Sequence, residues 1–146
     1  MKRTLIHNAT IVNEGRSVQG SVVIEGDRIA EVLTYGKKLS VPCDETIDAT
    51  GCCLLPGIID DHVHFRDPGL THKADIFTES RAAAAGGVTS IMDMPNTNPL
   101  TTTLSALEQK FDLLNEKCIV NHSCYFGATN NNYTAVSYTH LTLPRR

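Results

Sequence analysis

The stretch CCLLPGIIDDHVHFRDPG, residues 52–69, joins an apolar run to a dense group of polar side chains. The apolar run, residues 52–60, is typical of a strand that is buried on both faces, as in a parallel sheet. Two histidines, an arginine and an Asp-Pro-Gly turn follow it. In parallel α/β barrels the catalytic residues lie at the C-terminal ends of the strands. The stretch therefore predicts a parallel sheet with a chemically active strand end.

The chain that follows alternates between helical and strand patterns. Residues 74–87, ADIFTESRAAAAGG, predict a helix that ends at the Gly-Gly pair, and residues 88–94, VTSIMDM, predict a strand. Residues 101–118 predict a second helix, and residues 119–128 a third strand. The order β-α-β-α-β implies a parallel sheet with helical crossovers, so the fold class is α/β.

The second of these helices is amphipathic. Within it, Ser105 and Glu108 have the spacing of a capping box. Apolar residues recur at helical spacing, namely Leu104, Leu107, Phe111, Leu114 and Cys118. This pattern predicts one helix face buried against the sheet.

The N-terminal part has the sequence pattern of short β-strands rather than of alternating helices and strands. From Thr4 to about Ile47 the chain offers short alternating or β-branched runs, with Glu25-Gly26-Asp27 as a hairpin turn between two of them. We therefore expect residues 1–53 to form a small β-rich segment and residues 54–134 to form the β-α units of the parallel sheet.

The last residues, 135–146, read AVSYTHLTLPRR and continue no helical or strand period. The string resembles the translated read-through of a sequencing adapter. We therefore expect the chain from Ala135 onward to be a non-native tail, and the alternative is a genuine frayed terminus.

Two histidines are the candidate metal ligands. In an extended strand, side chains two residues apart share a face, so Asp60, His62 and His64 point the same way and the two imidazoles are neighbours. Neutral imidazoles at this spacing suit a divalent ion, and zinc is the usual one at a catalytic site with nitrogen ligands. Asp60 is then placed to accept a ring N–H and fix the tautomer. The alternative is a pair of surface or core histidines without a metal.

The five cysteines offer a competing interpretation, a structural zinc site completed by Cys52 or Cys53. Those residues lie at the other end of the predicted apolar strand, roughly 30 Å from the histidines if it is fully extended, which argues against a closed site. With an odd number and no C-x-x-C spacing, the cysteines predict reduced, partly buried side chains rather than disulfides.

Two further side chains are candidate substrate contacts. Arg66 presents a guanidinium fork that suits a carboxylate, although an ion pair with Asp67 on a solvated loop is the alternative. Asn96, which follows the second strand, offers a donor and an acceptor to a small planar amide or acid. Its alternative role is that of a turn residue or a helix cap.

Composition excludes several function classes. The formal net charge of −3 and the absence of a strongly basic segment speak against nucleic acid as a partner. No apolar run approaches the ~18 residues of a membrane span or has the form of a signal peptide, so we expect a cytoplasmic protein with no membrane partner. The sequence leaves the oligomeric state open, a homo-oligomer included.

Three stretches together resemble the amidohydrolase superfamily and, within it, the bacterial-type dihydroorotases. They are VVIEGDRIAEV…IDATGCCLLPG (residues 22–32 and 47–57), PGIIDDHVHFRDPG (residues 56–69) and AAAAGGVTSIMDMPNTNP (residues 82–99). The resemblance extends over about residues 3–130. It implies that the β-rich segment belongs to a small β-sandwich beside a (β/α)8 barrel of the TIM type, of which this chain holds only the first part.

Carried onto this sequence, the resemblance implies that His62 and His64 bind one or two zinc ions per subunit and that Arg66 and Asn96 hold the substrate carboxylate. The implied reaction is the reversible hydrolysis of dihydroorotate to N-carbamoyl-aspartate in pyrimidine biosynthesis. The family's later ligands and its general-base aspartate have no matching positions here. We therefore expect an N-terminal fragment that has no catalytic base and is inactive alone.

Two alternatives stay open. One is an allantoinase or a hydantoinase/dihydropyrimidinase-like cyclic amidase of the same superfamily; the arginine and the MPNT motif favour dihydroorotate, whose carboxylate needs a partner. The other is a non-catalytic, dihydroorotase-like scaffold, against which the retained histidines, arginine and asparagine speak.

Overall fold

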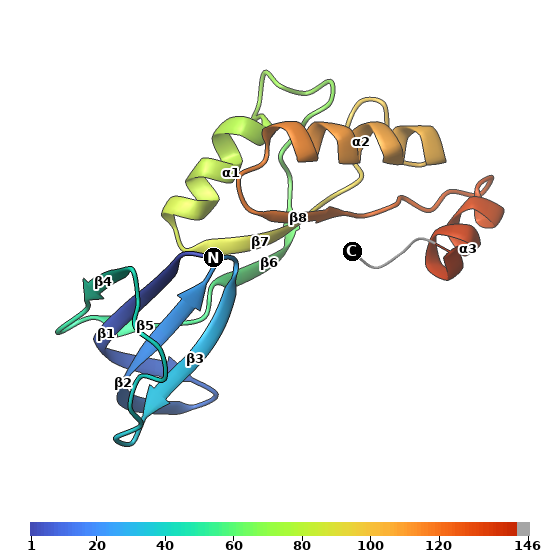
Figure 1. Ribbon diagram of the computed structural model, residues 1–146. Coiled ribbons are helices and arrows are strands. Elements are labelled where there is room, and N and C mark those ends of the chain that lie inside the picture. The colour runs from blue at the N-terminus through green and yellow to red at the C-terminus, as the bar shows by residue number, and fades with distance from the viewer. Residues whose placement is uncertain (143–146) are drawn as a thin grey trace. The chain divides into compact units, whose positions relative to one another are not determined.

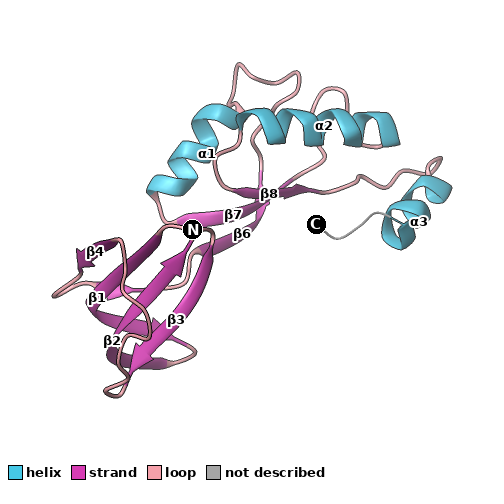
Figure 2. Ribbon diagram, in the orientation of Figure 1, coloured by secondary structure: helices cyan, strands magenta, loops and turns pink. Residues whose placement is uncertain are grey.

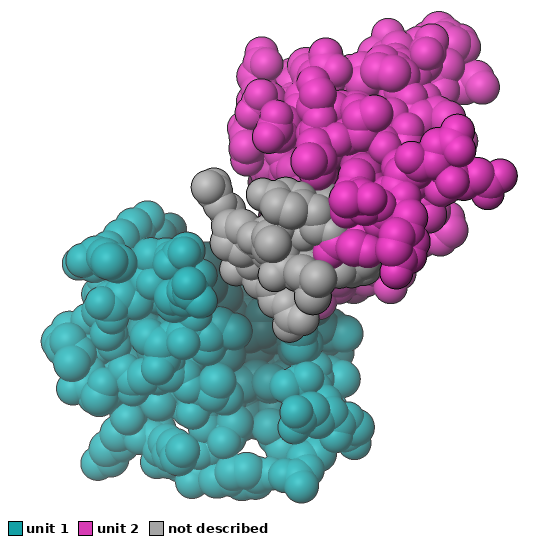
Figure 3. Space-filling model, turned by 90° about the vertical axis from the view of Figure 1, so that its right-hand side faces the viewer, with its two compact units in different colours: residues 1–56 teal, residues 57–146 magenta. Residues whose placement is uncertain are grey.

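The computed structural model describes residues 1–142, with side chains for residues 1–137 (Figures 1 and 2). The chain divides into two compact units, one over Met1–Pro56 and one that begins at Gly57, coloured separately in Figure 3. No helix in the described residues is both long and apolar enough to cross a lipid bilayer.

The first unit is a five-stranded sheet with the order β3-β2-β1-β4, in which β5 also pairs with β1. Pairing is antiparallel between β1, β2 and β3, whereas β4 and β5 run parallel to β1. The predicted turn is confirmed, because Gly26 takes a positive φ of 62° between β2 and β3. The strands are β1 (Arg3–Asn13), β2 (Arg16–Glu25), β3 (Arg28–Thr34), β4 (Glu45–Asp48) and β5 (Cys53–Leu54).

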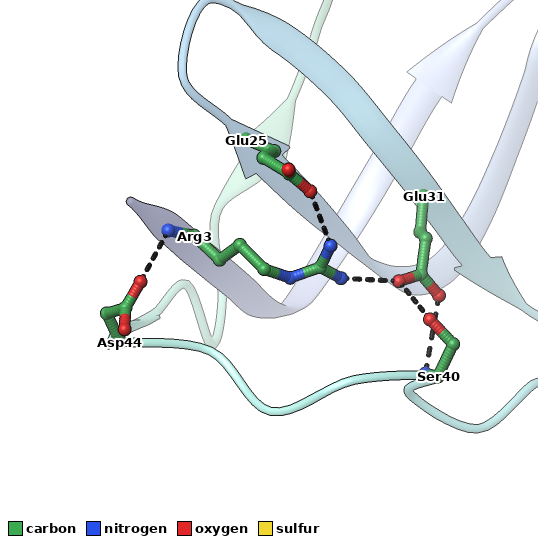
Figure 4. A network of polar contacts seen from close by, with 5 residues as sticks. All are labelled: Arg3, Glu25, Glu31, Ser40 and Asp44. Atoms are coloured by element: carbon green, nitrogen blue, oxygen red, sulfur yellow. Dashed lines mark hydrogen bonds and ion pairs between the residues drawn. The ribbon is translucent and has the colours of Figure 1, made fainter. Parts of the chain in front are cut away.

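A polar network ties the edges of this sheet together (Figure 4). The Arg3 guanidinium pairs with Glu25 at 2.5 Å and with Glu31 at 2.7 Å. The Arg3 backbone N–H donates to Asp44, and the Ser40 hydroxyl donates to Glu31. Because these partners come from β1, β2, β3 and the segment before β4, the network links four parts of the sheet.

The apolar run at residues 52–60 is not one buried strand, and that prediction is wrong. Residues Leu55–Gly57 divide it into β5, in the first unit, and β6, in the second. Ile58 and Ile59 are 55% and 71% exposed. Cys52 and Cys53 are exposed rather than partly buried, and all five cysteines are free thiols. A Pro-Gly pair interrupts strand pairing, and apolar content alone does not reveal such a break.

The second unit confirms the predicted β-α-β-α-β order. Its three strands pair in parallel in the order β6-β7-β8. The two crossover helices, α1 and α2, lie together over one face of this sheet (Figure 1). The elements are β6 (Ile58–Val63), α1 (Ile76–Ala85), β7 (Val88–Asp93), α2 (Leu104–Lys117), β8 (Asn121–Cys124) and α3 (Tyr133–Thr142).

The core of this unit lies between the sheet and the two helices. It is built from Phe65, Ile76, Ile91 and Leu114, each at most 5% exposed. Helix α1 ends at Gly86 as predicted. Helix α2 does not use the predicted capping box: its N-cap is Thr103, whose hydroxyl accepts the backbone N–H of Ala106 at 3.2 Å. The helix begins at Leu104, two residues before the start that a Ser105 cap would give, so the cap falls on Thr103.

Helix α3 includes residues 135–142, for which the sequence predicts no helix, so that expectation is corrected. At its start, the Val136 N–H donates to the carbonyl of Asn132. The YTAVSYTHLT sequence carries no apolar stripe, and a helix without such a stripe escapes a search for periodicity. The expectation that residues from Ala135 onward are non-native stays a prediction, and residues 143–146 lie outside the described residues.

Candidate active site

The ends of β6 and β7 are joined and carry the predicted site residues. The Met94 N–H, just after β7, donates to the carbonyl of Val63 at 2.9 Å. The side chain of Asp93, the last residue of β7, accepts the Phe65 N–H, two residues after the end of β6, at 3.0 Å. These bonds join the C-terminal ends of the two strands, so the residues that follow them meet at one rim.

The two imidazoles are neighbours, as predicted from their spacing. The ring centroids of His62 and His64 lie 5.3 Å apart. His64 Nδ1 lies 2.8 Å from Asn96 Oδ1. Because a carbonyl oxygen only accepts, Nδ1 carries the proton, and Nε2 keeps its lone pair for a ligand bond. The rim thus holds one imidazole in a fixed tautomer beside a second one.

Asp60 does not have the contact expected of it. Its carboxylate accepts the backbone N–H of His62 at 3.1 Å. Among the described residues the Asp60 carboxylate makes no hydrogen bond to an imidazole. The ring partner is instead Asn96, from the neighbouring strand end.

Arg66 lies in the left-handed region, with φ 66°. Within the part of the chain that the structure describes, its guanidinium has no hydrogen bond or ion pair, and the side chain is half-buried. The alternative ion pair with Asp67 is not formed, since that carboxylate pairs with Lys117 at 2.7 Å. This contact raises the pKa of Lys117 above its ordinary value. Arg66 therefore offers an unengaged guanidinium fork two residues after His64 in the chain.

The side-chain amide of Asn96 has an oxygen and a nitrogen with different roles. Its Oδ1 is taken by His64, which the sequence interpretation as a pure substrate contact missed. Its amide Nδ2 has no hydrogen bond within the described residues, and the residue is exposed. Asn96 can thus orient His64 and still donate to an oxygen of a bound molecule.

A buried ion pair lies directly beneath the rim and was missed from the sequence. Lys110 Nζ lies 2.6 Å from Asp93 Oδ2, and the two side chains are 0% and 1% exposed. The signal was present, because Lys110 falls three residues after Leu107 and four before Leu114, on the buried face of α2. A lysine at such a position requires a buried partner.

The loops after β6 and β7 are interlocked. The Asn98 N–H donates to the carbonyl of Pro68 at 3.1 Å. Gly69 has φ 80°, and a Cβ atom there would lie 1.9 Å from the carbonyl oxygen of Asn98. Only glycine fits this approach.

The donor set fits part of a metal site. Two adjacent imidazole nitrogens, one with its tautomer fixed, are suitable zinc ligands. No group of three or more His, Cys, Asp or Glu side chains that could hold a metal ion occurs among the residues described. His122, whose ring bonds Asn115 and the Val120 carbonyl, is not a third ligand. A catalytic zinc normally takes three protein ligands, so this chain supplies two of them at most.

Known structures resemble this chain over nearly its whole length. The L-hydantoinase (dihydropyrimidinase) from Arthrobacter aurescens superposes with a TM-score of 0.87 and 28% identity, covering 96% of this chain and 31% of that one. The dihydropyrimidinase from Brevibacillus agri gives a TM-score of 0.78 at 28% identity, with 96% and 31% covered. The predicted fold class is confirmed: a β-rich segment followed by the first part of an α/β barrel of the amidohydrolase superfamily.

Residues 51–139 match the model of a family described as dihydro-orotase-like. The chain belongs to this family. It is 38% identical over 134 residues to the dihydroorotase of Lactobacillus acidophilus, covering 92% of this chain and 30% of that protein. It is 41% identical over 127 residues to the dihydroorotase of Methanosarcina mazei, covering 86% and 27%. The chain thus spans about 30% of the length of the curated relatives it matches.

Proposed function

We propose that this chain carries the substrate-carboxylate and first metal-binding part of a zinc-dependent cyclic amidohydrolase, and that the reaction is the reversible hydrolysis of dihydroorotate to N-carbamoyl-aspartate. The observation that carries the proposal is the rim at which His64, oriented by Asn96, stands beside His62 and two residues before an unpaired Arg66. The names of the relatives support the same reaction.

Each side chain has a defined task in this proposal. A zinc ion, when bound, would supply Lewis-acid chemistry, lowering the pKa of water to about 7 and polarising the amide carbonyl. His62 and His64 would hold that ion, with the Nδ1–H bond to Asn96 keeping His64 Nε2 directed for ligation. Arg66 and Asn96 Nδ2 would bind the carboxylate of dihydroorotate and so fix the ring against rotation. Water adds across the ring amide, whose C–N bond breaks to leave N-carbamoyl-aspartate.

The remaining machinery is proposed to lie outside these residues. Two imidazoles are fewer than the three protein ligands of a catalytic zinc site, and among the described residues no group of three possible ligands occurs; we expect the general base, too, to come from residues beyond these. We therefore expect the 146-residue chain by itself to have no activity. We also place the protein in the cytoplasm, with small molecules as its partners, and leave a homo-oligomer open.

A hydantoinase or dihydropyrimidinase activity is the second candidate. The two structures above favour it, since they are structures of a hydantoinase and a dihydropyrimidinase. Arg66 distinguishes the candidates, because a neutral cyclic amide has no carboxylate for an unpaired guanidinium to bind.

The test uses the complete open reading frame that contains this chain, whatever its length. Turnover of dihydroorotate is compared with that of dihydrouracil, which has the same ring without the carboxylate. Arg66→Ala should lower kcat/KM for dihydroorotate by about tenfold to a hundredfold, the equivalent of about 1.5–3 kcal/mol for a charged contact. Arg81→Ala, on the exposed face of α1, is the matched control. Equal losses on both substrates would refute the carboxylate assignment.

Metal binding is tested separately in the same protein. His62→Ala and His64→Ala should each lower the zinc content measured by atomic emission, whereas His72→Ala, an exposed histidine of the following loop, should leave it unchanged. Unchanged zinc with both rim histidines replaced would show that they are not ligands.

A further inference from the structure

Arg66 has a backbone conformation that needs support from its surroundings. Its φ of 66° lies in the left-handed region, which is uncommon for residues other than glycine, asparagine and aspartate. Such a conformation costs free energy and persists only where neighbouring structure enforces it. The question is which contacts enforce it here.

Both neighbours of Arg66 in the chain are anchored. On one side the Phe65 N–H donates to Asp93 Oδ1 at 3.0 Å. On the other side Asp67, 4% exposed, pairs through its carboxylate with Lys117 Nζ at 2.7 Å. The Arg66 carbonyl itself accepts the Leu70 N–H at 3.0 Å. The residues on both sides of Arg66, and the peptide unit that follows it, are therefore held by separate contacts.

The two anchors lead to one helix. Asp93 pairs with Lys110 and Asp67 pairs with Lys117, and both lysines belong to α2. They are seven residues apart, which is about two helical turns, so they project from the same side of the helix. Helix α2 thus holds Asp67 directly through Lys117, and it holds Phe65 indirectly through Asp93.

We propose that Lys110 and Lys117 are positioning residues that, through Asp93 and Asp67, hold Arg66 in its left-handed conformation and so direct its guanidinium. Neither lysine touches the substrate in this scheme. The kinetic consequence rests on the proposed function, in which Arg66 binds a carboxylate. The conformational consequence does not depend on it.

Lys117 is the more useful of the two for a test. Its side chain is 32% exposed, so its replacement disturbs the core less than replacement of the fully buried Lys110. Lys117→Met removes the ammonium, Lys117→Arg keeps a cation within reach of Asp67, and Lys73→Met, an exposed lysine of the same β6–α1 connection, is the matched control. All variants are made in the complete open reading frame.

The kinetic readout separates positioning from general damage. Lys117→Met should raise KM for dihydroorotate by about tenfold with little change in kcat, and leave dihydrouracil turnover within about twofold of the parent. Lys117→Arg should restore most of the affinity, and Lys73→Met should change neither constant. Equal losses on both substrates, or no change on either, would overturn the proposal.

A chemical readout tests the conformation without catalysis. Modification of Arg66 by phenylglyoxal, mapped by mass spectrometry, should become several-fold faster in Lys117→Met. Arg3, held in its own network in the first unit, is the internal reference and should keep its rate. Faster modification of both arginines indicates general loosening and overturns the proposal, as does an unchanged rate at Arg66.

Failure of the proposed function can be distinguished from failure of the positioning proposal. If the parent protein turns over neither substrate, the proposed function fails, and the modification rates still decide whether Lys117 positions Arg66. If Lys117→Met does not fold, Asp67→Asn is measured in its place, because it weakens the same contact without leaving a buried carboxylate unpaired. It should accelerate Arg66 modification in the same direction, by less, and an unchanged rate would again refute the proposal.

Discussion

Replacement of Lys110 by methionine should destabilise the protein more than any surface change. Methionine nearly matches the lysine stem in volume, so the substitution removes the charge and keeps most of the packing. It leaves the Asp93 carboxylate, whose side chain is 1% exposed, without the ammonium that lies 2.6 Å from it. Breaking a buried pair by removal of one partner costs about 3–5 kcal/mol, and we expect a value in that range.

A double-mutant cycle turns this expectation into a measurement. In Asp93→Asn/Lys110→Met no charge is left buried, and the asparagine Oδ1 can still accept the Phe65 N–H. The double variant should therefore recover most of the lost stability, giving a coupling energy of at least about 2 kcal/mol. Urea denaturation of the complete open reading frame measures it, with Lys73→Met as a control that changes stability by about 0.5 kcal/mol or less. A Lys110→Met loss below about 1 kcal/mol, or a double variant less stable than the single one, would refute the reasoning.

Three further perturbations address other features of the chain. Burial raises the pKa of Cys124 to about 12, so at pH 8 this thiol should resist a disulfide reagent while the exposed Cys52 reacts. Because the pKa of Cys124 is higher in the folded than in the unfolded protein, the stability linked to it is present below about pH 8.5 and is lost as the pH rises toward 12. A series of denaturation midpoints measured across this pH range will follow the loss. Thr103→Ala removes the N-cap of α2 and should cost about 1 kcal/mol in the same denaturation assay, with Thr103→Ser close to the parent. Gly69→Ala should cost about 1–3 kcal/mol from its positive φ alone, and more from the collision with Asn98, so a variant as stable as the parent would contradict the interlocked loops.

The order of elements could be predicted from the sequence because its signals are local. The alanine run ended by Gly86, and the helical spacing of Leu107 and Leu114, place both crossover helices. The adjacent imidazoles likewise follow from the two-residue period of a strand. Other features depend on the tertiary fold: the partner of Lys110 is Asp93, seventeen residues earlier, and no local pattern connects them.

The errors have the same origin. Asp60 was assigned to an imidazole from spacing alone, whereas the ring partner, Asn96, is 32 residues away in sequence. The hydrophobicity of the run before the histidines did not reveal that its two halves belong to different sheets, whereas the Pro56-Gly57 pair marks the break between them. Sequence reasoning placed most elements but put the N-cap of α2 on Ser105 instead of Thr103, and it did not identify the distant residues that complete the contacts of Lys110 and His64.

Because the loops after β6 and β7 fit closely against each other, neither can be exchanged without the other. Pro68 and Gly69 fit against Asn98 without room for a methyl group, so an insertion or deletion in either loop displaces the other. Homologous exchange of one loop alone would separate the His64 and Asn96 side chains that meet across them. Changes of substrate range in this part of the barrel should therefore be engineered by transplanting both loops as one cassette, with their lengths matched.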